Sequence, residues 1–237
     1  VYQPKIDIGT GKIVSVEALS RWNHPELGQV SPVDFINMAE QIGMIKPLTE
    51  WALKTACSQS VLWREAGFSA IRMAVNISPS HFLDKDLVPL IKGVIKETGM
   101  LPSDLELEVT EGVVQTNQEN LAIFEHLKEL GILLAIDDFG VGYSSFASLK
   151  HLNVDFLKID KYFIDDMLTD NKAKLLIGSM IEMGHILGHK VTAEGIEKKE
   201  QFKMLQEFGC DSAQGYLFSK PVSANEITML FDRSFTC

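Results

Sequence analysis

Three glycines recur at a constant interval in the first half of the chain, at Gly67, Gly99 and Gly131. Each follows a stretch with apolar residues at helical spacing, and a glycine at that place typically ends a helix in the left-handed conformation. Successive glycines are 32 residues apart, a length that suits one helix and one strand. The interval therefore predicts a repeated strand–helix unit.

Short runs of β-branched and aliphatic residues alternate with the helical stretches. We expect strands at residues 1–7, 13–19, 71–78, 105–111, 133–138, 156–160, 190–197 and 212–219. We expect helices at residues 45–66, 80–98, 118–130, 162–187, 198–208 and 223–232. This alternation favours the α/β class, as a modified (β/α)8 TIM-like barrel rather than an open sheet. Because only five residues separate the first two strands, the first strand is expected to run antiparallel to the second.

Length and composition limit the other possibilities. The 237 residues contain no linker, so we expect residues 1–237 to form a single domain, a fragment of a longer multidomain protein because no methionine begins the chain. The net charge of −10 argues against a nucleic-acid polymer as partner.

No apolar run is long enough to cross a bilayer, so we expect a cytoplasmic domain without membrane contact. A segment elsewhere could still anchor the full-length protein to a membrane. The three widely spaced cysteines form neither a zinc pattern nor a disulfide framework.

Polar residues stand at the carboxyl ends of seven successive expected strands, where barrels of this kind hold their sites. They are Glu17, Asn76, Glu108 with Glu111, Asp137 with Asp138, Lys158 with Asp160, Glu194 with Glu197, and Gln214. Adjacent buried carboxylates repel each other and resist the loss of water, so they require a cation. Carboxylate and amide oxygens match Mg²⁺ or Mn²⁺. The number of carboxylates predicts two ions, as in two-metal phosphoryl displacement.

The motifs along the chain resemble those of the EAL domain family, the cyclic-di-GMP phosphodiesterases. The signature lies in "VEALSRW" (16–22), and the match includes "YQP" (2–4), "NIS" (76–78), "EVTE" (108–111), "DDFGVGYSS" (137–145), "LKID" (157–160), "AEGIE" (193–197) and "QGYLFSKP" (214–221). A lone "EAL" arises often by chance, whereas eight motifs in the family order are specific. The resemblance implies a barrel with an antiparallel first strand. It also implies metal-dependent hydrolysis of cyclic di-GMP to linear pGpG, which terminates second-messenger signalling.

The resemblance implies roles for individual residues. The metal ligands would be Glu17, Asn76, Glu108, Asp137, Asp138, Asp160 and Glu194, with Asp137 shared by the two ions. The catalytic residues would be Glu17, Lys158, Glu194, Glu197 and Gln214. Lys158 would hold or deprotonate the attacking water, with Glu197 orienting it and Gln214 contacting the water or the metal shell. Because a lysine among carboxylates tends to stay protonated, we favour electrostatic positioning by Lys158 over proton abstraction.

The resemblance also implies substrate contacts and a coupling to other parts of the protein. Gln3, Arg21, Asn76 and Asp138 would bind cyclic di-GMP, with the Arg21 guanidinium on a phosphate oxygen and Gln3 near a guanine. A mobile loop with Gly140, Gly142 and Ser144 would carry Asp138, be braced by Glu111 and lead to a homodimer interface. Family members often carry an upstream regulatory or sensory domain.

Other interpretations compete with this one. The same fold could be a catalytically silent receptor of cyclic di-GMP, although receptors of that kind have lost part of the carboxylate set that is complete here. A metal-dependent barrel of another class would need a lysine or histidine base beside a single ion, and only Lys158 qualifies. For Glu197 and Arg21 the alternative is an ordinary ion pair.

Overall fold

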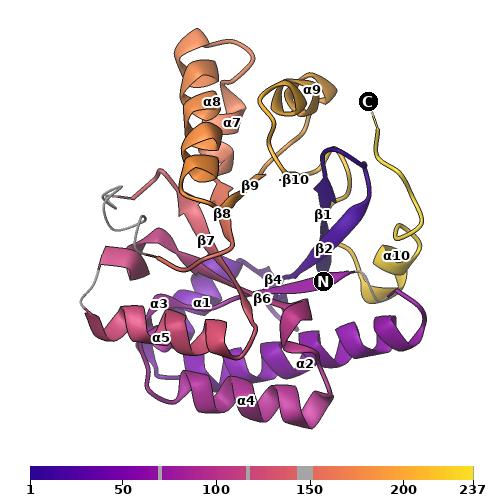
Figure 1. The fold of residues 1–237 in the computed structure, drawn as a ribbon. Helices are drawn as coiled ribbons and strands as arrows, with labels where there is room; N and C mark the ends of the chain where they lie inside the picture. The colour runs from indigo at the N-terminus through magenta and orange to yellow at the C-terminus, as the bar shows by residue number, and fades with distance from the viewer. Residues whose placement is uncertain (69–70, 116–117, 143–151, 237) are drawn as a thin grey trace.

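The computed structural model describes residues 1–68, 71–115, 118–142 and 152–236. In this part of the chain, eight strands form a closed barrel in the order β1-β10-β9-β8-β7-β6-β5-β2 (Figure 1). The strands are β1 Tyr2–Asp7, β2 Ile13–Ala18, β5 Arg72–Asn76, β6 Leu105–Thr110, β7 Leu133–Phe139, β8 Phe156–Ile159, β9 Lys190–Ala193 and β10 Ser212–Gln214. Strand β1 is antiparallel to both β2 and β10, and the other neighbours are parallel. The predicted barrel and its antiparallel first strand are confirmed.

Helices surround the barrel, with α2, α4 and α5 together on one side and α8 and α9 on another (Figure 1). They are α1 Pro32–Gln41, α2 Ile45–Glu65, α3 Pro79–Phe82, α4 Leu87–Thr98, α5 Gln118–Glu129, α7 Lys161–Asp165, α8 Asn171–Ile186, α9 Lys199–Glu207 and α10 Ala224–Thr228, with short 3-10 turns η1 Pro102–Asp104 and η2 Glu111–Gln115. Gly67, Gly99 and Gly131 follow helices α2, α4 and α5 and have φ values of 100°, 73° and 84°. The predicted left-handed helix ends are confirmed. None of the helices in the described ranges is both long and apolar enough to cross a membrane.

The structure divides two helices that the sequence pattern had made continuous. Residues 80–98 form α3 and α4, separated by a turn in which the Asp84 carboxylate accepts a hydrogen bond from the Asp86 N–H at 2.9 Å. Residues 162–187 form α7 and α8, and the Asp170 carboxylate caps α8 through the Lys172 N–H at 2.8 Å. Short acidic side chains that bond to the nearby backbone compete with helix continuation, and hydrophobic periodicity does not register them.

Strand ends and the first connection also differ from expectation. Strands β5, β6, β9 and β10 end at Asn76, Thr110, Ala193 and Gln214, up to five residues earlier than predicted. The residues that follow β5, β9 and β10 belong to loops and turns, and Glu111 after β6 begins η2. A small hairpin, β3 Trp22–His24 with β4 Gly28–Val30, and helix α1 occupy the region after β2, where the sequence analysis predicted no element.

The barrel interior is polar near the site, because several strands carry buried charged residues on one face. In β6, Leu105, Leu107 and Val109 alternate with Glu106 and Glu108, and all five are buried. The apolar face packs in the hydrophobic core with residues of the surrounding helices. The carboxylates contact residues of strands that are not their neighbours in the barrel, so they lie inside it. Period-2 alternation thus places successive charged layers along the barrel axis.

Candidate active site

Lys158 is the centre of the charge cluster at the carboxyl ends of the strands. Its Nζ lies 2.6 Å from Glu108 Oε2, 3.0 Å from Asp137 Oδ1 and 2.8 Å from Glu194 Oε1. Only 1% of the Lys158 side chain is exposed. Three strands, β6, β7 and β8, and the loop after β9 thus bring one cation and three carboxylates together at the mouth of the barrel.

Glu17 is held by amide groups from both sides. Its Oε1 accepts a hydrogen bond from Asn76 Nδ2 at 2.5 Å, and its Oε2 accepts one from Gln214 Nε2 at 2.6 Å. The same Gln214 amide donates to Gln3 Oε1 at 3.1 Å, and Gln3 Nε2 donates to the Ser219 carbonyl at 3.1 Å. Asn76 and Gln214, which are 59 and 197 positions from Glu17 in the sequence, therefore fix its carboxylate, because β10, β1, β2 and β5 are consecutive in the barrel.

The paired aspartates lie at an irregularity of β7. The register with β8 shifts between Ile136 and Phe139. Asp138 has a φ of 56°, the only positive φ of a non-glycine residue in the described ranges. Its N–H donates to Asp137 Oδ1 at 2.9 Å. A regular strand would direct two successive side chains to opposite faces, whereas at this irregularity the charge of Asp138 still interacts with those of Asp137 and Lys158.

Asp160 begins helix α7. Its Oδ1 accepts a hydrogen bond from the Tyr162 N–H at 2.9 Å, which caps the helix. Burial raises the pKa of Asp138, and the charges of Asp137 and Asp160 raise it further. The three aspartates are therefore close enough to repel one another, as a shared cation site requires.

Glu111 holds the segment that follows β7. Its Oε2 accepts hydrogen bonds from the N–H groups of Gly140 at 3.0 Å and Gly142 at 3.1 Å. A Cβ on Gly142 would lie 3.1 Å from the Glu111 carboxyl, and Gly140 has a φ of 95° with Met180 and Phe163 against it. A side chain at Gly140 would strain the backbone because of its positive φ, and one at Gly142 would crowd the Glu111 carboxyl. Ser144 lies outside the described residues, and coupling of this loop to a dimer interface stays a prediction.

Among the described residues, Glu197 and Arg21 form no ion pair with Lys158 or its three carboxylate partners. Glu197 does not contact Lys158, since its side chain is 48% exposed and pairs with Lys161 at 2.9 Å. Gly195, with a φ of 69°, turns the chain between Glu194 and Glu197, so only the first of these carboxylates enters the barrel. Arg21 donates to the Ser20 carbonyl at 2.8 Å and forms no ion pair with any described residue.

A cleft of about 270 Å³ opens directly beside these groups. The catalytic candidates Glu17, Glu194 and Gln214 line it. The other residues around it are Gln3, Leu19, Lys161, Gly195, Glu197, Gly215 and Tyr216. The cleft gives a ligand access to the charge cluster from the side of β1, β2, β9 and β10.

The electrostatics of the cluster follow from burial. Burial alone would lower the pKa of Lys158, but Asp137, Glu108 and Glu194 raise it well above its ordinary value. Burial alone would raise the pKa of Glu108, but Lys158 and Lys5 lower it to about 2. Burial raises the pKa of Glu194 to about 8, with Asp137 and Glu17 adding to the effect and Lys158 opposing it. Lys158 therefore remains a cation, and the site contains more carboxylates than its two lysines neutralise.

We predict that the metal-free protein loses stability as the pH rises from about 5 to about 8. The Glu194 pKa is about 8 in the folded protein, above its ordinary value of 4.5, so in this window the folded state binds the proton that the unfolded state has released. The free energy of unfolding then falls with pH, by on the order of a few kcal/mol. Urea unfolding in EDTA across this pH range measures the decrease in the free energy of unfolding. The Glu194→Gln variant should lack the part of this decrease that Glu194 causes. An equal dependence of the free energy of unfolding on pH in both proteins would contradict the prediction.

Two charged residues of the interior were not singled out in the sequence analysis. Lys5 contacts Glu106 Oε1 at 2.6 Å and also contacts Glu108. The sequence could have indicated Lys5 and Glu106. Lys5 is two residues from Gln3, and Glu106 is two residues from Glu108, so each pair lies on the same face of its strand.

The described residues contain no group of three or more His, Cys, Asp or Glu side chains already arranged to hold a metal ion. The amine of Lys158 lies between the carboxylates instead and contacts three of the predicted ligands. The chemistry of the donor set still fits a hard cation, because it consists of carboxylate and amide oxygens whose mutual repulsion an added positive charge would relieve.

Comparison with known proteins identifies the family. The model of the EAL domain family matches residues 1–221. The chain belongs to the EAL domain family. The "EAL" motif at residues 17–19 thus supplies Glu17 at the end of β2 and Leu19 beside the cleft.

Characterised relatives align with almost the whole EAL domain. MucR of Pseudomonas aeruginosa, a bifunctional diguanylate cyclase/cyclic di-GMP phosphodiesterase, is 37% identical over 227 residues, which are 95% of this chain and 33% of MucR. The cyclic di-GMP phosphodiesterase NbdA of the same organism is 40% identical over 222 residues, 93% of this chain and 28% of NbdA. A solved structure, the PaMucR phosphodiesterase in complex with c-di-GMP, superimposes with a TM-score of 0.92 at 37% identity and covers 95% of this chain and 92% of that one. The EAL domain spans a third or less of the length of these two curated relatives.

Proposed function

We propose that this EAL domain hydrolyses one 3′–5′ phosphodiester bond of cyclic di-GMP and releases linear pGpG. The observation that carries the proposal is the buried cluster of Glu108, Asp137, Glu194 and Lys158 beside a cleft at the carboxyl ends of the strands. The relatives MucR and NbdA, which are named cyclic di-GMP phosphodiesterases, and the c-di-GMP complex of PaMucR support the choice of substrate.

The donor set fits two Mg²⁺ or Mn²⁺ ions. Burial raises the pKa values of Glu194, Glu17 and Asp138, and neighbouring carboxylates raise them further. Divalent cations would offset the repulsion that Lys158 and Lys5 leave uncompensated. The residues that would hold the ions are Glu17, Asn76, Glu108, Asp137, Asp138, Asp160 and Glu194, with Asp137 shared. When bound, such ions lower the pKa of water and stabilise the leaving oxygen of an in-line displacement.

The protein's own side chains supply positioning and charge. Lys158 stays protonated, so it attracts the attacking water and the negative charge that develops on the phosphate rather than accepting a proton. Asn76 and Gln214 fix the orientation of Glu17 by their hydrogen bonds. Arg21 and Gln3 contact the substrate, the former at a phosphate oxygen. Most of the rate enhancement then comes from holding the reactants in line within a fixed charge distribution.

The setting of the domain is also part of the proposal. This domain works as a homodimer in the cytoplasm, with an upstream regulatory or sensory domain that acts through the Glu111-bound loop. The limited coverage of MucR and NbdA supports a multidomain protein. The buried free thiols of Cys57 and Cys210 suit a reducing compartment. The full-length protein could be anchored to a membrane, while this domain contacts neither a membrane nor a nucleic-acid polymer.

Incubation of the purified protein with cyclic di-GMP tests the proposal. We expect pGpG to accumulate with Mg²⁺ or Mn²⁺, to stop forming in EDTA and to form again when Mn²⁺ is restored, with the products separated by HPLC. Tight binding of cyclic di-GMP without pGpG in any metal would contradict the enzyme and indicate the receptor. Hydrolysis that persists in EDTA would contradict the metal assignment.

A further inference from the structure

Lys5 lies inside the barrel one layer below the mouth. Its neighbour in β2 is Ser15, whereas Gln3 is opposite Glu17. The Lys5 side chain is 3% exposed, and its Nζ contacts Glu108 Oε1 and lies 2.6 Å from Glu106 Oε1. Strands β1 and β6 are not adjacent in the barrel, so Lys5 reaches across the interior to make both contacts.

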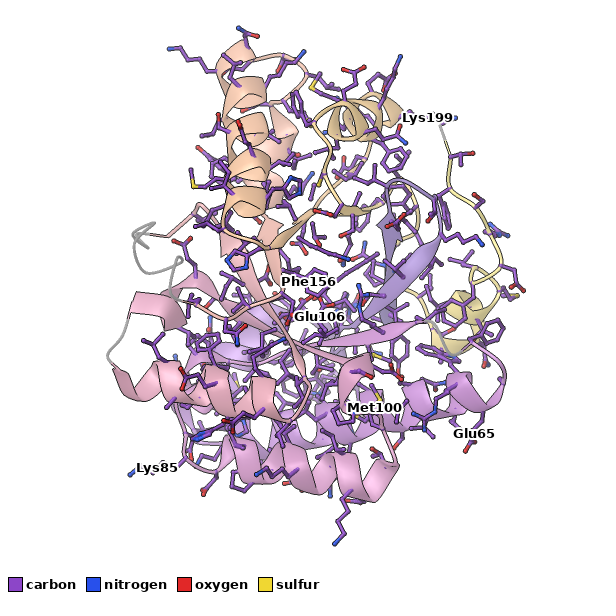
Figure 2. The ribbon with its side chains drawn as sticks, viewed as in Figure 1. Glu65, Lys85, Met100, Glu106, Phe156 and Lys199 are labelled. Carbon is purple, nitrogen blue, oxygen red and sulfur yellow. The ribbon has the colours of Figure 1, made fainter. Side chains whose placement is uncertain are left out.

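The Lys5 contacts continue toward the opposite end of the barrel as a series of alternating charges. Glu106 Oε2 lies 3.6 Å from Arg72 Nε, and the Arg72 guanidinium carbon lies 5.1 Å from the centre of the Phe156 ring. Glu106 on β6 and Phe156 on β8, the two residues that Arg72 contacts here, are labelled in Figure 2. Glu106 therefore holds Lys5 from the side away from the mouth, and Glu106 itself pairs with Arg72.

Stability alone does not account for these charges. Barrels of this type usually fill their interior with branched apolar side chains. A buried ion pair generally stabilises a protein no better than apolar residues of similar volume. The inward positions beside β6 are small, Ala74 and Ala135, which face Glu106 and Glu108 in register. These small neighbours leave room for the Lys5 side chain between the strands.

We infer that Lys5 is a positioning residue for Glu108, with Glu106 holding Lys5 in place. Each Glu108 oxygen has its own cation: Oε1 contacts Lys5, and Oε2 lies 2.6 Å from Lys158. With Oε1 fixed from below, the carboxylate cannot rotate away from the mouth, where Asp137 and Glu194 surround Lys158. This inference rests on the proposed function, since it assigns Glu108 to the metal site.

The double variant Lys5→Met/Glu106→Gln tests the inference. It removes one charge of each sign, so the net charge around the site is unchanged and any effect reports orientation. We expect the Mn²⁺ affinity, measured by titration calorimetry without substrate, to fall roughly 10- to 100-fold, as when other partners of metal ligands are lost. We expect kcat to fall by a similar factor, with KM for cyclic di-GMP unchanged within about threefold, since Lys5 is below the cleft.

Lys128→Met/Asp155→Asn is the matched control. It removes a lysine–carboxylate pair at 2.6 Å that lies outside the cluster, and it should lower the melting temperature without changing the Mn²⁺ affinity. Wild-type Mn²⁺ affinity and kcat in the folded Lys5→Met/Glu106→Gln variant would overturn the inference.

A second variant covers the case in which the double variant does not fold. Glu106→Gln alone keeps Lys5 but weakens its lower anchor, so the Mn²⁺ affinity should fall several-fold. Unchanged affinity in this variant would overturn the inference. A wild-type protein that binds Mn²⁺ but leaves cyclic di-GMP intact would contradict only the proposed function, because the affinity comparison still decides the role of Lys5.

Discussion

The Lys158→Met variant is expected to hydrolyse cyclic di-GMP roughly 10²- to 10³-fold more slowly than the wild type, the usual cost of losing one fixed electrostatic group at a reacting phosphate or carbonyl. Methionine fills a similar volume but carries no charge. The attacking water and the developing negative charge would then lose the cation that Glu108, Asp137 and Glu194 hold in place. Steady-state HPLC assays at saturating Mn²⁺ measure kcat, and wild-type turnover would contradict the role of Lys158.

The same variant should also separate stability from catalysis. In EDTA, loss of Lys158 leaves three carboxylates without their shared cation, which we expect to lower the free energy of unfolding by roughly 3–5 kcal/mol. Added Mn²⁺ should recover part of this loss, because it supplies positive charge to the same carboxylates. Urea unfolding with and without Mn²⁺ measures both quantities. Lys54→Met, which removes an exposed ion-pair partner on α2, serves as the control and should change little.

The Glu17→Gln variant is expected to lose hydrolysis by roughly 10³-fold or more while the fold stays intact. The carboxylate is a proposed metal ligand, and loss of several kcal/mol of charge stabilisation corresponds to a tenfold decrease for each ~1.4 kcal/mol. Its two oxygens accept hydrogen bonds from Asn76 and Gln214, and a glutamine can accept only one of them well. Stability should change little in EDTA, because burial already raises the pKa of Glu17 and disfavours its charge.

Circular dichroism and the HPLC assay together test this second prediction. Glu26→Gln, in the exposed turn of the β3–β4 hairpin, is the matched control and should retain full activity. Full activity in Glu17→Gln would contradict its assignment as a metal ligand. An unfolded Glu17→Gln protein would show instead that the hydrogen bonds to Asn76 and Gln214 hold the barrel closed.

Much of the site could be predicted because topology converts sequence position into proximity. Once the alternation of strands and helices indicated a barrel, Asn76, Glu108, Asp137 and Lys158 had to meet at one end of it, since they occupy the carboxyl ends of successive parallel strands. The structure brings them together through Lys158 and the Glu17 hydrogen bonds. This inference depends only on the direction of each strand and not on how far apart the residues lie in the sequence.

Residues beyond the strand ends were harder to predict. Glu197 is four residues after β9, and the left-handed turn at Gly195 directs it toward Lys161 rather than Lys158. Asp160 is one residue after β8, and it begins α7 as well as facing the other aspartates. Loop conformation follows from φ values and capping bonds, which the motif spacing does not specify.

The sequence by itself determined the barrel, its antiparallel first strand, the family and the end of the barrel at which the charged residues collect, because periodicity, turn length and motif order depend on neighbours in the chain. Only the tertiary structure decided which charges pair. Lys5 with Glu106 and Lys158 with Glu108 are ion pairs between strands that are not neighbours in the barrel. Their partners depend on the stagger of the strands and on how far each side chain reaches through a polar interior, and both are properties of the closed sheet as a whole.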